Sequence, residues 1–148
     1  MITTIHSIAS QVSNDVETIT SLMMEALLED SGIDISNKIE QYNYIYRLGI
    51  SCQSLMMFLA KVDNVVAGCA MIQLKASEKT GMIENVFVRE PFRRMGVATS
   101  LMVNAMNEGW LLGLNRMWLE CNEMSINLYS KLGWKYSECG STMEIYRD

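Results

Sequence analysis

The chain has 148 residues, 49% of them hydrophobic and 20% charged, which is the composition of a folded protein and not of a disordered one. It has a single proline and no Gly- or Ser-rich linker, so we expect one domain over residues 1–148. The net charge of −5, without a basic stripe, argues against a nucleic-acid partner. No apolar run reaches the roughly 20 residues that cross a bilayer, and the first residues do not resemble a signal peptide. We therefore expect a cytoplasmic protein without a membrane partner.

The charge is unevenly distributed, because residues 1–40 hold seven carboxylates and one lysine, a net charge of −6. Four of the acidic residues lie where the first predicted helix ends: Glu25, Glu29, Asp30 and Asp34. Such a cluster can attract a cationic substrate by long-range steering. Solvated outer faces of helices would explain the same residues, and the sequence leaves both interpretations open.

The four cysteines lie far apart, and the chain has one histidine, His6, to which we assign no role. Zinc sites use cysteine and histidine at short, regular spacings, so we expect no metal. We expect the thiols to be reduced and to serve as small buried hydrophobic groups: Cys52, Cys69, Cys121 and Cys139.

The hydrophobic pattern predicts a strand at 2–8 and then a helix that Asn14 or Asp15 caps and that ends at Ser31-Gly32. One stripe of that helix is apolar: Val16, Ile19, Leu22, Met23, Ala26 and Leu27. A second amphipathic segment covers about 39–48. We expect three of its residues to face inward: Tyr42, Ile45 and Tyr46.

Next, strands at 54–62 and 65–74 flank Asp63-Asn64, a sequence typical of a hairpin turn. The strand at 81–88 is apolar on both faces, which predicts a central position in the sheet.

The spacing of the hydrophobic residues then changes to that of a helix at about 96–112. Gly113 ends this helix, and Leu112 belongs to its apolar face. A strand at 117–121, a short helix at 125–132 and strands at 134–138 and 142–146 follow. The order β-α-α-β-β-β-α-β-α-β-β predicts an α/β domain with a mixed sheet and a right-handed β-α-β crossover.

The segment between the strand at 81–88 and the helix that begins at Gly96 is suited to bind a phosphate. Helix N-termini present unpaired N–H groups and a positive dipole end, and Gly96 and Ala98 lack bulk. Basic and hydroxyl side chains add donors: Arg93, Arg94, Thr99 and Ser100. The P-loop and the dinucleotide fingerprint are both absent. Close packing of a small-residue helix start would explain the glycine and alanine equally well.

Two motifs in this half of the chain resemble the signatures of the GNAT superfamily of acyl-CoA-dependent N-acyltransferases. Arg93-Arg-Met-Gly-Val-Ala98 matches the family's pyrophosphate loop, [R/Q]-x-x-G-x-[G/A]. Residues 122–134 look like its second signature, N-x-x-A-x-x-L-Y-x-K-x-G-F. The close match runs from Gly81 to Trp134. The departures are mild: Ala98, Ser125 and Trp134 replace glycine, alanine and phenylalanine, and Pro91 lies one place later than is common.

The resemblance implies a mixed, mostly antiparallel sheet flanked by helices, and acetyl-CoA as the acyl donor without a metal. It implies that the pyrophosphate lies on the first turn of the helix at 96–112. The pantetheine arm would lie between the strands at 81–88 and 117–121, which splay apart in this family. The residues that match the cofactor site are Phe87, Val88, Arg93, Arg94, Met95, Gly96, Val97, Ala98, Thr99 and Asn122.

The resemblance also assigns Tyr129 as the acid that protonates the departing thiolate. Core packing would explain Tyr129 as well, because its neighbours at helical spacing are apolar. A base is needed too, since an alkylamine has a pKa of about 10.4. Glu84 is the candidate, and we expect it to share an apolar face with Met82, Val86 and Val88. An ion pair at the sheet edge is the alternative role for Glu84, and we expect Asn85 to be structural.

These residues predict an N-acetyltransferase that passes an acetyl group from acetyl-CoA directly to a primary amine. Two alternatives stay open, a non-catalytic acyl-CoA-binding module and a protein-interaction module on the same fold. The acceptor is a small-molecule or protein amine: a polyamine, an aminoglycoside, an amino acid, a protein N-terminus or a lysine. The sequence does not distinguish a homodimer from a monomer.

Overall fold

The computed structural model describes residues 2–8, 14–138 and 140–147, with their side chains except those of Thr3, Ile5 and His6. The strands are β1 (Ile2–Ile8), β2 (Leu55–Val62), β3 (Val65–Lys75), β4 (Thr80–Val88), β5 (Arg116–Glu120), β6 (Lys135–Tyr136) and β7 (Thr142–Tyr146). The helices are α1 (Asn14–Ser31), α2 (Ile39–Ser51), α3 (Val97–Leu111) and α4 (Ile126–Lys131), with 3₁₀ turns η1 (Ser36–Lys38), η2 (Ala76–Glu78) and η3 (Glu90–Phe92). This chain order confirms the predicted one.

The strands form one seven-stranded sheet in the order β1-β2-β3-β4-β5-β7-β6, so β4 is central as predicted. Every neighbouring pair is antiparallel except β4 and β5, which are parallel and are joined through α3. The β4–β5 pairing covers only Thr80–Met82 against Arg116–Trp118. Beyond these residues no ladder joins the two strands, in agreement with the expected splay.

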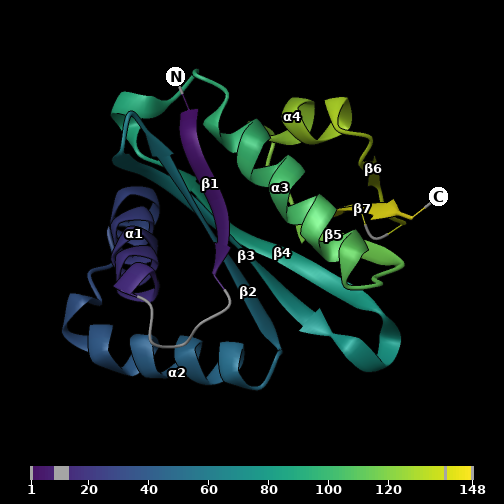
Figure 1. Ribbon diagram of the computed structural model, residues 1–148. Coiled ribbons are helices and arrows are strands. Elements are labelled where there is room, and N and C mark those ends of the chain that lie inside the picture. Colours follow the sequence, from purple (N-terminus) through teal and green to yellow (C-terminus); the bar gives the residue numbers. More distant parts are fainter. Residues whose placement is uncertain (1, 9–13, 139, 148) are drawn as a thin grey trace.

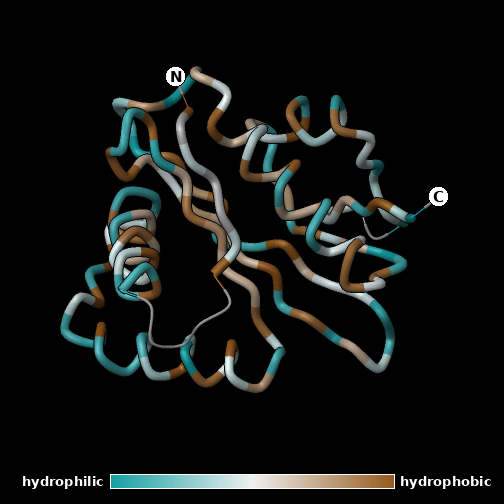
Figure 2. The backbone as a smooth tube through the Cα atoms, viewed as in Figure 1, coloured by the Kyte–Doolittle hydropathy of each residue, from teal (hydrophilic) through white to brown (hydrophobic). Residues whose placement is uncertain are grey.

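Helices cover both faces of the sheet (Figure 1). On one face α3 and α4 pack over a core that includes Phe58, Leu101, Met117 and Trp134. On the other face α1 and α2 enclose a second core around residues such as Ile19. The central strands are coloured as hydrophobic over much of their length, because both of their faces are covered (Figure 2).

The β2–β3 hairpin turns at the predicted dipeptide. Asp63 and Asn64 have φ values of 48° and 69°. Two successive positive φ values define the tight hairpin turn whose twist matches that of the strands, and Asn and Asp tolerate them better than most residues.

A β-bulge in β4 overturns one prediction. Asn85 has a φ of 54°, and the β3–β4 register shifts at this point. The extra residue reverses the alternation, so Val86 and Val88 pack against the core under α3 while Phe87 joins the core under α1. Glu84 therefore does not share a face with Val86 and Val88, as the unbroken alternation had suggested.

Some predicted burial is also wrong. Ile45 is 55% exposed, because α2 packs at the edge of the sheet, against β2 and α1. Leu112 is 57% exposed, because it follows the last residue of α3. In α1 it is Met24, not Met23, that is fully buried. The final strand pair is shorter than predicted, since Trp134 turns into the core before β6 begins.

Of the cysteines, Cys69 is buried, Cys121 is half-buried and Cys52 is exposed, which corrects the expectation of burial for Cys52. Cys52 follows the last residue of α2 and lies in the turn before β2. Cys139 lies outside the described residues. Among the helices that are described, none is long and apolar enough to cross a membrane.

Candidate functional site

The loop between β4 and α3 leaves the first amides of α3 open. Arg94 has a φ of 64° and Gly96 a φ of 84°, and α3 then begins at Val97 without a side-chain cap. A Cβ added at Gly96 would meet no atom within 4 Å, so the approach to the backbone is clear. Val97 itself is buried in the core, which leaves its backbone N–H as the group that can contact a ligand. This arrangement suits an anion.

Arg93 makes three contacts within the protein. Its Nε donates to the carbonyl oxygen of Val88 at 2.8 Å, and its Nη2 donates to Oε2 of Glu29 at 2.5 Å. Its guanidinium also lies 5.8 Å from the ring centroid of Phe87. Arg93 is therefore held against α1, whereas the exposed Arg94 and Met95 complete the loop on its open side.

A second ion pair, besides that of Arg93 with Glu29, joins the start of the loop to α1. Arg89 donates to Glu25, one helical turn before Glu29, at 3.2 Å. Asp34 accepts a hydrogen bond from the backbone N–H of Ser36, and hydrogen bonds from Ser36 lower the pKa of Asp34. Two members of the predicted acidic cluster, Glu25 and Glu29, are thus neutralised by arginines that flank the loop, which weakens the expected attraction for cations.

The side chain of Thr99 lines a polar hollow of about 460 Å³ between β1 and α3. Its other lining residues are Ile2, Thr4, Ser100, Val103, Asn104 and Asn107. Of these residues, Thr99 and Ser100 belong to the first turn of α3.

Asn122 organises the start of α4. Its Oδ1 accepts hydrogen bonds from the backbone N–H of Ser125 at 3.1 Å and from the Ser125 hydroxyl at 3.0 Å. These bonds order the turn that precedes α4, whose N-cap, Ser125, makes no side-chain capping hydrogen bond. The resemblance places Asn122 at the cofactor site, and its contacts within the protein are those with Ser125.

Tyr129 is 7% exposed and packs with its ring centroid 6.3 Å from that of Trp134. Burial raises the pKa of Tyr129; a hydrogen bond with the Ser125 side chain lowers it and the nearby Cys121 raises it. The phenol therefore lies beside Ser125 and Cys121, where the chain leaves β5. The ring packs in the core, as the packing interpretation predicted.

Glu84 is half-buried on the α1–α2 side of the sheet. Its Oε1 accepts a hydrogen bond of 2.5 Å from Nε2 of Gln73 on β3. Burial raises the pKa of Tyr46 of α2, and the charge of Glu84 raises it further. Tyr46 therefore lies close to Glu84. The Tyr46 hydroxyl donates to the sulfur of Met23 at 3.0 Å. Neither Gln73 nor Tyr46 belongs to a motif, although Tyr46 was expected to face inward from its helix.

Glu84 and Tyr129 lie on opposite faces of the sheet. The unpaired stretch between β4 and β5 is the place that both faces border.

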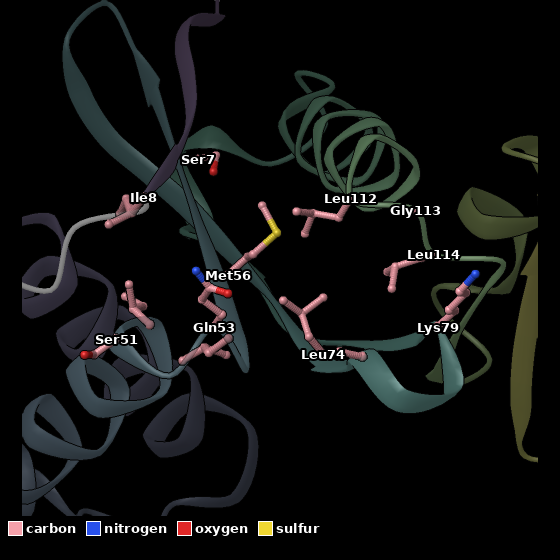
Figure 3. Close-up of a pocket in the computed structure, with 13 residues that line it drawn as sticks. Ser7, Ile8, Ser51, Gln53, Met56, Leu74, Lys79, Leu112, Gly113 and Leu114 are labelled. Atoms are coloured by element: carbon pink, nitrogen blue, oxygen red, sulfur yellow. The ribbon is translucent and has the colours of Figure 1, made fainter.

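A hollow of about 940 Å³ lies elsewhere (Figure 3). It lies between the ends of β1 and α2 and the turn after α3, with Met56, Leu74 and Leu112 directed toward it. None of the predicted site residues lines it.

Residues 20–134 match the model of the acetyltransferase (GNAT) family. The chain belongs to this family. It is also 34% identical over 94 residues to an N-alpha-acetyltransferase of Sulfurisphaera tokodaii, over 53% of this chain and 55% of that protein. The chain thus spans about half the length of this curated relative.

Two solved structures support the fold of this GNAT chain. A predicted acetyltransferase of Clostridium acetobutylicum, crystallised with acetyl-CoA, superposes with a TM-score of 0.72 at 18% identity, covering 93% of this chain and 92% of that one. The PaiA N-acetyltransferase of Thermoplasma acidophilum, in complex with coenzyme A, gives a TM-score of 0.69 at 15% identity, covering 98% and 100%.

Proposed function

We propose that this GNAT protein is an N-acetyltransferase that passes an acetyl group from acetyl-CoA directly to a primary amine. The open first turn of α3 carries the proposal, because its amides and the clear face of Gly96 fit a pyrophosphate. The backbone of residues 94–98 would hold that group. Phe87 and Val88, beside the β4–β5 opening, would hold the pantetheine arm through their backbone.

Acetyl-CoA supplies the activated acetyl group when bound. Glu84 takes a proton from the acceptor ammonium, which frees the nitrogen lone pair for attack on the thioester carbon. As the carbon–sulfur bond breaks, Tyr129 donates its phenolic proton to the departing sulfur, and the nitrogen gives up its second proton, which restores the neutral phenol and leaves the amide. Because burial raises the pKa of Tyr129, the phenol keeps that proton at neutral pH.

As acceptor we propose the α-amine of a polypeptide N-terminus. The relative from Sulfurisphaera tokodaii is named for that activity. The ion pairs of Glu25 and Glu29 favour the same choice over a polyamine, since two of the carboxylates that would attract a polycation are already neutralised.

A thiol-release assay tests the activity and the acceptor together. We expect coenzyme A release with acetyl-CoA and a short peptide with a free N-terminus. Release should be much slower with the same peptide carrying a blocked N-terminus and an internal lysine, and with spermidine. Saturable acetyl-CoA binding without release to any amine would instead identify a non-catalytic binding module.

Gly96→Val tests the coenzyme site. Valine disfavours the φ of 84° and places a branched side chain where the pyrophosphate would approach, so coenzyme A affinity should fall. Gly32→Val is the matched control, because Gly32 also has a positive φ, of 70°, and open space around its Cβ position, but follows α1. Equal coenzyme A affinity in both variants would refute the assignment.

A further inference from the structure

Gln73 and Glu84 meet across two paired strands. In the β3–β4 ladder Met71 pairs with Glu84 and Gln73 pairs with Met82, so Gln73 and Glu84 are diagonal neighbours on one face. Their side chains form the 2.5 Å hydrogen bond from Nε2 to Oε1. The ladder fixes both backbones, so the position of the amide relative to the carboxylate is set by the sheet and not by a mobile loop.

The setting of this pair is accessible to solutes. Gln73 is exposed and Glu84 half-buried, so a solute can reach the carboxylate. Tyr46 of α2 lies close enough for the charge of Glu84 to raise the pKa of the tyrosine, after burial. Tyr42 of α2 and the buried Cys69 of β3 lie around Tyr46 in turn, and burial raises the pKa of Cys69 to about 12.

We propose that Gln73 is a positioning residue for Glu84, an inference that rests on the proposed function. A hydrogen bond to a carboxylate oxygen favours the charged form of the carboxylate. With Oε1 held by the amide, Oε2 stays free to take a proton from the acceptor. The ammonium N–H bond breaks as the O–H bond forms on Oε2, and the nitrogen keeps the electron pair that attacks the acetyl carbon.

The test compares Gln73→Leu and Gln73→Glu with the wild type in profiles of kcat/KM against pH. Gln73→Leu removes the donor, so the acidic limb of the profile should move to higher pH. We expect a loss of about 10-fold on the acidic limb that recovers on the plateau at higher pH, since hydrogen bonds to charged groups are worth more than neutral ones. Gln73→Glu keeps the shape of the side chain but places a second negative charge beside Glu84. The acidic limb of its profile should therefore move to still higher pH than that of Gln73→Leu. The KM for acetyl-CoA should stay unchanged in both.

Gln41→Leu, on the exposed face of α2, is the control for the loss of an exposed amide. A Gln73→Leu loss of the same size at every pH would mean that Gln73 only supports the fold, and an unchanged profile would mean that it does nothing; either result overturns the proposal. If Gln73→Leu does not fold, Gln73→Glu alone decides by the same criterion. Absence of thiol release in the wild type would refute the proposed function itself, a result separate from any effect of Gln73.

Discussion

The segment from Gly81 to Trp134 and the segment from Ile2 to Lys75 contribute to the candidate site in different ways. In the first, the site is made by contacts between residues close in sequence, such as the hydrogen bond from the Ser125 N–H to Asn122, three residues earlier. In the second, the contributions come through contacts over long separations, such as the Arg93–Glu29 pair across 64 residues. Local motifs can encode the first kind of contact, whereas the second exists only after the sheet has formed.

The largest effect expected is on turnover, within the motif-encoded segment. Tyr129→Phe keeps the packing against Trp134 but removes the proton donor, so coenzyme A affinity should be unchanged while kcat falls about 10²- to 10⁴-fold. Binding titrations and steady-state kinetics measure the two quantities separately. An unchanged kcat would assign Tyr129 to the core alone, and a change only in KM would indicate a role in positioning.

The next effect is on the free energy of unfolding. It compares glycine substitutions whose new Cβ would contact a fixed backbone atom with those whose Cβ would contact a movable side chain. A Cβ at Gly68 of β3 would lie 2.5 Å from the backbone oxygen of Phe87. Because that atom is fixed in the β4 ladder, Gly68→Ala should lower the free energy of unfolding by about 1–3 kcal/mol. A Cβ at Gly109 of α3 would lie 2.7 Å from the terminal methyl of Met117, which can move.

Gly109→Ala should therefore be close to neutral, since alanine is about 1 kcal/mol better than glycine inside a helix and offsets the local adjustment. Urea unfolding of the two variants measures both values. Equal losses in the two proteins would show that the mobility of the contacted atom does not decide the outcome.

The predictable part of the molecule is the part that local patterns encode. Periodicity predicts the order of the elements, and the Asp63-Asn64 turn follows from the backbone preferences of two residues. The loop before α3 and its open first turn follow from glycine and small residues at fixed spacing. The resemblance extends this to the family, since the same residues form the matched motifs.

The bulge at Asn85 shows where such patterns fail. Alternation places Glu84 with Val86 and Val88, and one extra residue in β4 reverses the faces. Arg93 shows a different limit: no motif encodes its contact with Glu29, whose position depends on how α1 packs on the sheet, and its role at the phosphate stays a prediction. Gln73 gives no signal at all, because it becomes relevant only through strand pairing.

A smaller effect tests the N-terminal segment through alkaline stability. Burial and the charge of Glu84 raise the pKa of Tyr46, so above pH 10 the unfolded chain loses this proton before the folded one. Stability should therefore fall as pH rises above the ordinary tyrosine value, by at most about 1.4 kcal/mol per pH unit for this group. Urea unfolding at pH 9 and pH 11 should show a smaller fall in Tyr46→Phe. Tyr44→Phe, on the same helix with Tyr44 67% exposed, should behave as the wild type; an equal slope in all three proteins would contradict the account.

The smallest effect decides whether α1 influences the coenzyme loop through charge. Glu29→Gln removes a carboxylate beside the loop and releases Arg93, so coenzyme A should bind more tightly at low salt. The gain should be at most about 5-fold, because ion pairs between exposed groups contribute less than about 1 kcal/mol, and it should shrink as salt is raised.

Glu17→Gln is the matched control, since Glu17 lies on the same helix and pairs with Arg47 of α2 at 3.1 Å, not with the loop. Isothermal titration at two salt concentrations compares the three proteins. Weaker binding in Glu29→Gln would mean that the ion pair holds the loop in its binding geometry, and the N-terminal segment would then act on the coenzyme site through position and not through charge.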